Sequence, residues 1–199
     1  FAAYAAAGAD QGGVGAMGTP GFGFYSATAL NGAINGTLNL NITAAASTLT
    51  TSGTVNALRF NPTAPATVTI TAGQTLTIDS GGLLMAANQT LGISGGSVTS
   101  GGSELFAYIN QNTTSIGSVL TGSMALVKGG AGGLTLTGNN TYTGTTYVNQ
   151  GTLTLNTAGA NATTTVAVPG ALVVNNAAVT LSAQKQISNT ATVTLNGAS

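Results

Sequence analysis

Residues 133–156 read GLTLTGNNTYTGTTYVNQGTLTLN, and this stretch contains the clearest structural pattern in the chain. Leu134 and Leu153 stand in the same local setting, an apolar–polar–apolar strand that begins near a glycine. One equal step after Leu153, the sequence GALVVN places Leu172 in what we expect to be the equivalent position. A short strand that recurs at a step of about 20 residues is typical of the coils of a β-solenoid. The stretch therefore predicts a structural repeat rather than a catalytic site.

Short apolar–polar alternations continue on both sides of this stretch. Each is about four to eight residues long, and Gly, Asn, Ser or Pro separates one from the next, as expected for strands joined by turns. The segments are GTLNLNIT (36–43), TVNALRF (54–60), TVTITAG (67–73), QTLTIDS (74–80), TLGIS (90–94), ELFAYI (104–109), SIGSVL (115–120), MALV (124–127), ALVVN (171–175), AVTLS (178–182) and ATVTLN (191–196). No apolar stripe at helical spacing persists, so we expect an all-β fold.

The alternation within each strand assigns its two faces. In the sequence TLTL, Leu153 and Leu155 point to one side and the two threonines point to the other. An interior lined with Leu, Ile and Val, with Thr on the outside, is the economical arrangement. The core residues expected for the repeat are Leu134, Leu136, Leu153, Leu155 and Leu172. A step of about 20 residues predicts roughly ten coils for the whole chain.

The same stretch resembles the autotransporter-associated β-strand repeat, also called the passenger-associated transport repeat. The pattern of that family is roughly G-x-L-x-L-x-G-x-N-T-Y-x-G-x-T-x-(apolar)-x-x-G-T-L. The residues that match it are Gly133, Leu134, Leu136, Gly138, Asn140, Thr141, Tyr142, Gly144, Thr146, Val148, Gly151, Thr152 and Leu153. The resemblance implies a right-handed parallel β-helix that is exported across an outer membrane and displayed on a Gram-negative-type cell. The residues expected at the turns of the repeat are Gly138, Asn140, Tyr142, Gly144 and Gly151.

The N-terminal segment, residues 1–30, differs from the rest of the chain. It is rich in Gly and Ala, and it carries the aromatic residues Phe22, Phe24 and Tyr25. We expect residues 1–30 to form a cap or a donated arm, with those three aromatics as assembly contacts, and residues 31–199 to form the solenoid body. The chain lacks an initiator Met and ends in mid-pattern, which we interpret as a mature or trimmed segment with an uncapped coil at both ends.

The composition excludes several classes of function. Only 3% of the residues are charged, the net charge is zero, and the chain contains no His and no Cys. An ordinary globular protein has about 25% charged residues, so a basic patch that attracts nucleic acid is excluded. Without cysteine there are no disulfides and no thiolate metal sites. No apolar run reaches the roughly 18 residues of a membrane-spanning helix, so we expect no integral membrane segment.

Two glycine-rich patterns near the start of the chain are too weak to predict a cofactor or a metal. Gly13, Gly15 and Gly18 match the dinucleotide-binding fingerprint, but no strand precedes them and a Thr-Pro-Gly sequence follows where a helix should begin. In a calcium-binding nonapeptide, Met17 would stand where an Asp ligand is required. We therefore expect no cofactor and no metal.

The charged residues do not predict a catalytic site. Asp79 and Glu104 are separated by little more than one expected repeat step, so they could lie one coil apart as a glycosidase-like carboxylate pair. The simpler interpretation is that Asp79 caps a turn and Glu104 is a solvated charge at a strand edge. Lys128 and Lys185 have no acid nearby in sequence, and Arg59 is expected to point outward. We expect no enzyme activity.

The leading functional interpretation is a structural or adhesive extracellular element that self-associates end to end into a fibre or rod. Exposed coil ends present unpaired backbone groups that favour stacking, and a net charge of zero provides little repulsion between copies. The expected partner is therefore a second copy of the chain.

Two alternatives remain open. The first is carbohydrate or surface binding along one face, for which Phe106, Tyr108, Tyr142 and Tyr147 are the available aromatics, although Tyr142 is better explained as a turn-packing residue. The second is ice binding by the recurring Thr-x-Thr pairs. The regularity of those pairs is expected to break after residues 152–154, where Ala171 and Val173 would take the outward positions.

Overall fold

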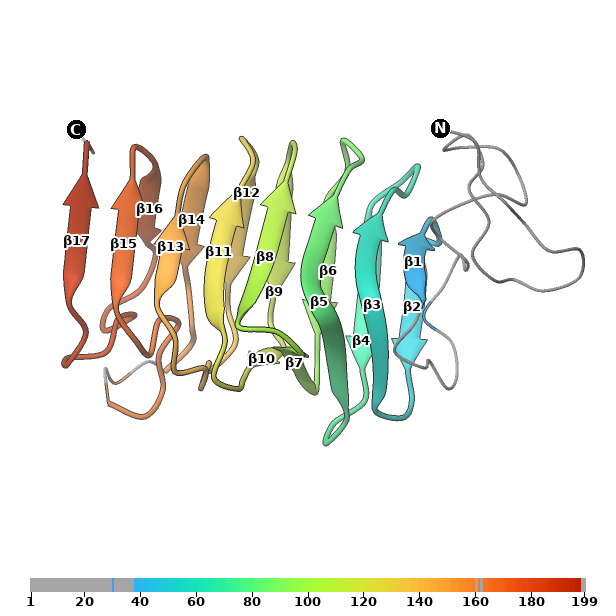
Figure 1. Ribbon diagram of the computed structural model, residues 1–199, viewed down its shortest axis with the longest axis horizontal. Coiled ribbons are helices and arrows are strands. Elements are labelled where there is room, and N and C mark those ends of the chain that lie inside the picture. Colours follow the sequence, from blue (N-terminus) through green and yellow to red (C-terminus); the bar gives the residue numbers. More distant parts are fainter. Residues whose placement is uncertain (1–29, 31–37, 160, 162, 198–199) are drawn as a thin grey trace, which may run out of the picture.

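The computed structural model describes residues 30, 38–159, 161 and 163–197, and all the regular secondary structure in these ranges is β-strand. The strands wind into a parallel β-solenoid whose coils follow one another along the longest axis of the molecule, from β1 to β17 (Figure 1). The all-β solenoid expected from the sequence is confirmed. Within the described part of the chain, no helix has the length and apolar character needed to cross a lipid bilayer.

Two sheets form the walls of the solenoid. The ten-stranded sheet contains β1 (Asn39–Ile42), β3 (Gly53–Phe60), β5 (Thr75–Met85), β7 (Ser97–Ser100), β8 (Glu104–Ile109), β10 (Val119–Leu120), β11 (Ala125–Gly129), β13 (Thr146–Val148), β15 (Leu172–Asn175) and β17 (Val193–Asn196). The seven-stranded sheet contains β2 (Ala46–Leu49), β4 (Ala66–Ile70), β6 (Leu91–Ser94), β9 (Thr113–Ile116), β12 (Gly133–Leu136), β14 (Thr152–Leu155) and β16 (Ala178–Leu181). The paired strands run parallel, as they must when successive coils wind in the same direction.

The described residues form seven coils, since the seven-stranded sheet receives one strand from each coil. The expectation of roughly ten coils is too high. Leu134 pairs with Leu153, which is the step expected from the sequence, but Leu153 pairs with Val179, which lies well beyond an equal step. Because the turns vary in length, a coil contains on average more residues than the repeat at 133–156 implies.

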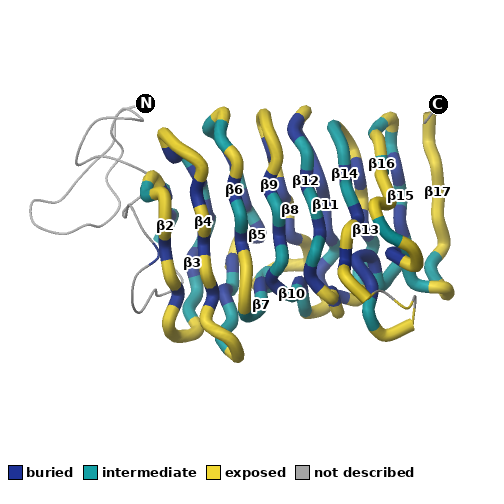
Figure 2. The backbone as a smooth tube through the Cα atoms, turned by 180° about the vertical axis from the view of Figure 1, so that it is seen from behind, coloured by how far each residue is buried: buried dark blue, intermediate teal, exposed yellow. Residues whose placement is uncertain are grey.

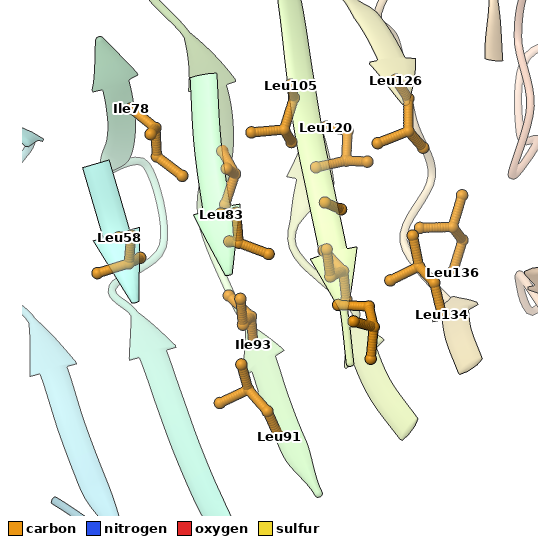
Figure 3. Close-up of a cluster of buried hydrophobic side chains, with 14 of the residues drawn as sticks. Leu58, Ile78, Leu83, Leu91, Ile93, Leu105, Leu120, Leu126, Leu134 and Leu136 are labelled. Carbon is orange, nitrogen blue, oxygen red and sulfur yellow. The ribbon is translucent and has the colours of Figure 1, made fainter. Parts of the chain in front are cut away.

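The core is a set of apolar columns between the two sheets. Buried and exposed residues alternate along most strands, so that one side of each strand faces the interior (Figure 2). Side chains from both sheets belong to one core cluster inside the solenoid, which includes Leu105 and Leu126 of the ten-stranded sheet and Leu134 and Leu136 of the seven-stranded sheet (Figure 3). Fully burying such a side chain contributes about 2 kcal/mol to folding, so the inward columns stabilise the stack.

Leu172 does not continue the column of Leu134 and Leu153. Leu134 pairs with Leu153, and Leu153 pairs with Val179 of β16. Leu172 belongs to β15 of the ten-stranded sheet, where it pairs with Thr146 and is buried. The expected position was wrong because strands of both sheets show the same alternation, and a local sequence of the form L-x-(apolar) does not reveal which sheet it joins.

The two ends of the stack differ. In the C-terminal coil, Leu181, Val193 and Leu195 are 54%, 49% and 63% exposed. In the N-terminal coil the inward residues Leu40 and Leu49 are fully buried, and the buried Leu30 belongs to the same core. The inward residues of the C-terminal coil are therefore exposed and those of the N-terminal coil are buried, and the expectation of an uncapped coil at both ends stays a prediction.

Candidate functional site

Asn140 joins three coils through its side-chain amide. The backbone N–H of Leu120, on the preceding coil, donates a 2.9 Å hydrogen bond to Asn140 Oδ1. Asn140 Nδ2 in turn donates a 2.8 Å hydrogen bond to the backbone carbonyl of Ala167, which follows later in the chain. Asn140 is buried, so these two bonds satisfy backbone groups that water does not reach. The Asn of the repeat pattern therefore has a structural role in this chain.

Tyr142 is also an internal residue of the repeat. Its side chain is fully buried, and its hydroxyl shares a 2.5 Å hydrogen bond with Thr146 Oγ1. Burial raises the pKa of the Tyr142 hydroxyl well above its ordinary value, because the phenolate would lose its hydration, and the bond to Thr146 offsets part of this effect. Tyr142 packs inside the solenoid and contributes no aromatic surface.

The glycines of the repeat lie where successive coils approach each other closely. At Gly138, Gly144 and Gly151 an added Cβ atom would lie 2.5 Å from a backbone carbonyl oxygen of the preceding coil. Gly151 also has a φ of +70°, a left-handed conformation that other residues adopt at a cost. Steric exclusion between coils thus explains why these positions carry Gly.

Lys128 points into the solenoid, on the same side of β11 as the buried Leu126, and the alternation in MALVK was the signal that could have indicated this. Its neighbours in register, Ala107 and Val148, are both buried, and Lys128 is fully buried as well. Its ammonium group donates hydrogen bonds to the backbone carbonyls of Gly129 (2.8 Å), Gly130 (2.7 Å) and Gln150 (3.1 Å). Burial lowers the pKa of Lys128 to about 8. Three carbonyl acceptors match the three donors of an ammonium ion, so this residue closes a turn between two coils.

The outer surface of the ten-stranded sheet carries an aromatic face. We use this name for the exposed side chains of Phe106, Tyr108 and Tyr147, which are 40%, 38% and 37% exposed. Phe106 and Tyr108 alternate with buried residues on β8, and their stacked rings have centroids 6.2 Å apart. Phe106 pairs with Val127 of β11, and Val127 pairs with Tyr147 of β13. Three consecutive strands of the sheet therefore bring the three rings onto one surface.

Gly129 provides the space into which two of these rings lean. It pairs with Tyr108 across the β8–β11 ladder. A Cβ atom at Gly129 would lie 3.1 Å from Phe106 Cζ and 3.3 Å from Tyr108 Cδ2, closer than side chains normally pack. The rings therefore lie over the β11 backbone rather than standing away from the sheet, and they give the aromatic face a low relief.

A ladder of asparagine amides borders the aromatic face. Asn149, two residues beyond Tyr147 on the same side of the chain, accepts a 2.7 Å hydrogen bond from Asn175, and Asn175 accepts a 2.8 Å bond from Asn196. A second short ladder joins Asn112 to Asn88 in earlier coils, with a 2.8 Å bond, in the turns that lead from the ten-stranded to the seven-stranded sheet. Such ladders hold successive coils in register.

The remaining residues considered from the sequence do not form a chemical site. Asp79 and Glu104 are both exposed, and Asp79 lies against the turn at Gly101. In the described ranges no group of three or more His, Cys, Asp or Glu side chains is placed to hold a metal ion. Lys185 lies exposed in a turn with a φ of +57°. The candidate assembly aromatics Phe22, Phe24 and Tyr25 lie outside the described residues.

The threonine array on the seven-stranded sheet is more continuous than expected. Thr135 pairs with Thr154, and Thr154 pairs with Thr180, so one outward column keeps its hydroxyl over three coils. The interruption expected at Ala171 and Val173 does not fall on this face, because both residues belong to the wall formed by the ten-stranded sheet. The neighbouring outward column is interrupted instead where Thr152 pairs with Gly133 and Ala178. The ice-binding alternative stays a prediction.

The molecule is thus a parallel β-solenoid with an aromatic outer face and without a recognised chemical centre among the described residues. Comparison with known proteins adds the repeat family: residues 126–155 match the family described as Passenger-associated-transport-repeat. Over 108 residues, 49% of this chain, the sequence is 35% identical to the Adhesin BmaC autotransporter of Brucella suis biovar 1 (strain 1330). The chain therefore carries a passenger-associated transport repeat, and the resemblance noted in the sequence is confirmed. The matched segment spans 3% of that adhesin, and no solved structure matches the chain.

Proposed function

We propose that this chain is a non-enzymatic, adhesive segment of an extracellular bacterial surface protein, and that the aromatic face is its contact surface. The single observation that carries this proposal is the presence of three exposed aromatic rings on consecutive strands of one sheet. Exposed aromatic residues with a polar border are typical of binding surfaces, because the rings supply contact area at little cost in conformational entropy. The similarity to an autotransporter adhesin supports display outside the cell.

Adhesion of the purified chain to surfaces tests this proposal. Fluorescently labelled chain is applied to animal-cell monolayers and to plates coated with polysaccharides, and the bound fraction is measured. The triple substitution Phe106→Ser, Tyr108→Ser and Tyr147→Ser is expected to abolish binding. The double substitution Thr135→Ala and Thr154→Ala changes the opposite sheet and serves as the matched control. Equal binding by the triple variant and the wild type would remove the aromatic face from consideration.

A second role, end-to-end self-association, is favoured by the C-terminal end of the stack. There the half-exposed Leu181, Val193 and Leu195 would be covered by a further coil, and the free edge of β17 would gain hydrogen bonds. Among the described residues, the N-terminal coil shows no comparable exposed apolar side chains, since Leu40 and Leu49 are fully buried. Association through the C-terminal end alone would produce pairs, whereas a fibre requires two complementary ends.

Light scattering coupled to size-exclusion chromatography, with negative-stain microscopy, tests the second role. The wild-type chain is expected to form larger species at high concentration, and Leu195→Asp is expected to return it to the monomer. Thr194→Asp, which changes the outward neighbour of Leu195, is the control. Monomers of the wild type throughout the concentration range would rule out self-association.

A further inference from the structure

We propose that the aromatic face binds an uncharged, linear polysaccharide of β-linked hexopyranose units, which lies across the strands and along the axis of the stack. The inference rests on the adhesive function proposed above and names the ligand of that surface. It is carried by the spacing of the rings, by the small area of the face, by its position inside the sheet and by its charge.

The spacing of the rings favours a ligand that repeats along the stack. Phe106, Val127 and Tyr147 occupy one register column on β8, β11 and β13. Neighbouring strands lie about 4.8 Å apart, so two steps separate the backbones at Phe106 and Tyr147 by roughly 10 Å. This separation corresponds to about two steps from one sugar ring to the next, so the two adjacent rings of a disaccharide cannot stack on both positions. One extended glycan can therefore stack one sugar ring on the Phe106–Tyr108 pair and another on Tyr147.

The shape of the face favours β-linked chains. β Linkages that are equatorial at both linked carbons, as in cello-oligosaccharides, keep a polysaccharide extended and present the flat C–H faces of its sugar rings, which can pack on aromatic rings. The face itself has low relief, because the Phe106 and Tyr108 rings lie over Gly129 and because Val127 between the aromatic positions is nearly buried. A helical α-linked chain would leave such a surface after one or two units.

The area of the face argues against a protein partner. An aromatic side chain has about 150–250 Å² of surface, so three rings that are about 40% exposed present roughly 250 Å². A stable protein–protein interface buries about 800 Å² on each partner. The exposed rings alone match two or three stacked sugar units much better than a folded protein surface.

The position of the face argues against peptide capture by strand addition. An added peptide strand needs a free sheet edge with unpaired backbone groups. β8, β11 and β13 lie inside the ten-stranded sheet, with hydrogen-bonded neighbours on both sides. Only side chains can therefore make the contacts, namely the aromatic rings, the Tyr hydroxyls and the amide of Asn149 at the border.

The charge of the face favours a neutral ligand. On β8, β11 and β13 the outward positions carry one charged residue, Glu104, because Lys128 points into the solenoid. No outward cation on these three strands would pair with the carboxylates or sulfates of an acidic polysaccharide, and Glu104 would repel them. An uncharged polysaccharide needs no cation as a partner and is not repelled by Glu104.

Titration calorimetry with defined oligosaccharides tests the inference. Cello-oligosaccharides are titrated into the full chain, from the disaccharide to the hexasaccharide. We expect affinity to rise about ten-fold at the length that reaches both ring positions and then to level off, since one aromatic contact contributes about that factor. Tyr147→Ala should remove this rise, so that the longer oligosaccharides bind no more tightly than the disaccharide. Thr154→Ala, on the opposite sheet, should behave as wild type.

Further ligands and one further variant complete the test. Malto-oligosaccharides, which are α-linked, and polygalacturonate, which is acidic, should bind at least ten-fold more weakly than the cello-oligosaccharides. Gly129→Val should weaken binding even though it removes no ring, because its side chain displaces Phe106 and Tyr108. Binding that is independent of chain length, or stronger for polygalacturonate, would overturn the inference.

The outcomes separate this inference from the proposed function. If the triple aromatic variant loses adhesion to cells but no neutral oligosaccharide binds the wild type, the aromatic face is adhesive and its ligand is of another class. If the triple variant adheres as well as the wild type, the proposed contact surface itself is wrong.

Discussion

The ammonium group of Lys128 donates a 3.1 Å hydrogen bond to the backbone carbonyl of Gln150, which lies on the next coil of the stack. The same group binds the carbonyls of Gly129 and Gly130 on its own coil. In a chain with three cations and three anions, one cation thus lies inside the core, and no carboxylate of the described residues is its partner. Its role is to satisfy three carbonyl groups at a turn where the backbone is rich in glycine.

Lys128 should make the stability of the protein depend on pH. Its pKa is about 8 in the folded state, against 10.5 for an ordinary lysine, so between these values the unfolded state binds more protons than the folded state. The free energy of unfolding should therefore rise as the pH increases from about 8 to about 10. Urea titrations across this range measure the slope, and Lys128→Met should flatten it. A slope that survives in the variant would assign the effect to another group.

The two faces of β14 should respond oppositely to a new charge. Leu153 is fully buried between Leu134 and Val179, so Leu153→Asp places a carboxylate in the core and should destabilise the protein by about 4 kcal/mol or more. Thr154 faces outward, and Thr154→Asp should change stability by less than about 0.5 kcal/mol. Circular dichroism during thermal unfolding measures both variants, and an equal loss of β structure would refute the assignment of faces.

Asn140 should be far more sensitive to substitution than its exposed counterpart Asn156. Asn140→Ala leaves the Leu120 N–H and the Ala167 carbonyl without their partners in a buried setting. Each unsatisfied group costs about 1–3 kcal/mol, so for two groups we expect a loss of roughly 2–6 kcal/mol. Asn156→Ala, at an exposed outer position, should lose less than about 0.5 kcal/mol. Denaturant unfolding compares the two, and similar losses would show that Asn140 does not bridge the coils.

Gly151 and Gly73 distinguish backbone strain from steric exclusion between coils. Both have left-handed backbones, with φ of +70° and +78°. A Cβ atom at Gly151 would lie 2.5 Å from the carbonyl oxygen of Gly132, whereas at Gly73 it would meet nothing within 4 Å. Gly73→Ala should therefore cost only about 1 kcal/mol, and Gly151→Ala should cost several times more. Melting temperatures of the two variants test this, and equal shifts would mean that the coils separate easily at Gly151.

Much of the local structure was readable from the repeat. The alternation of TLTL assigned the inward leucines correctly, because side chains on neighbouring positions of a strand must point to opposite faces. The same rule applied to ELFAYI places Phe106 and Tyr108 outside, opposite the buried Leu105 and Ala107. The outward direction of these two rings could be predicted from the sequence. Only the structure showed that they share one surface with Tyr147.

The wrong position expected for Leu172 shows that local sequence does not predict which sheet a strand joins. GALVVN resembles the strand around Leu153 in sequence and step, yet it joins the other sheet because the turn between β14 and β15 is long. The coil count failed for the same reason, since Leu153 pairs with Val179 rather than with a residue one equal step along the chain. The length of each turn determines which strands pair with each other. The residues of a turn do not by themselves predict its conformation.

The sequence by itself determined that this chain is all-β, which side of most strands faces inward, and where glycine is required at the repeat turns. These properties follow from side-chain alternation and short-range sterics, which act between near neighbours in the chain. Only the tertiary structure decided which coils stack in register, and hence that Phe106, Tyr108 and Tyr147 share one face. It also decided that Lys128 is buried and that Leu195 is exposed. These depend on pairing between strands that are a full coil apart in the sequence, which local preferences do not encode.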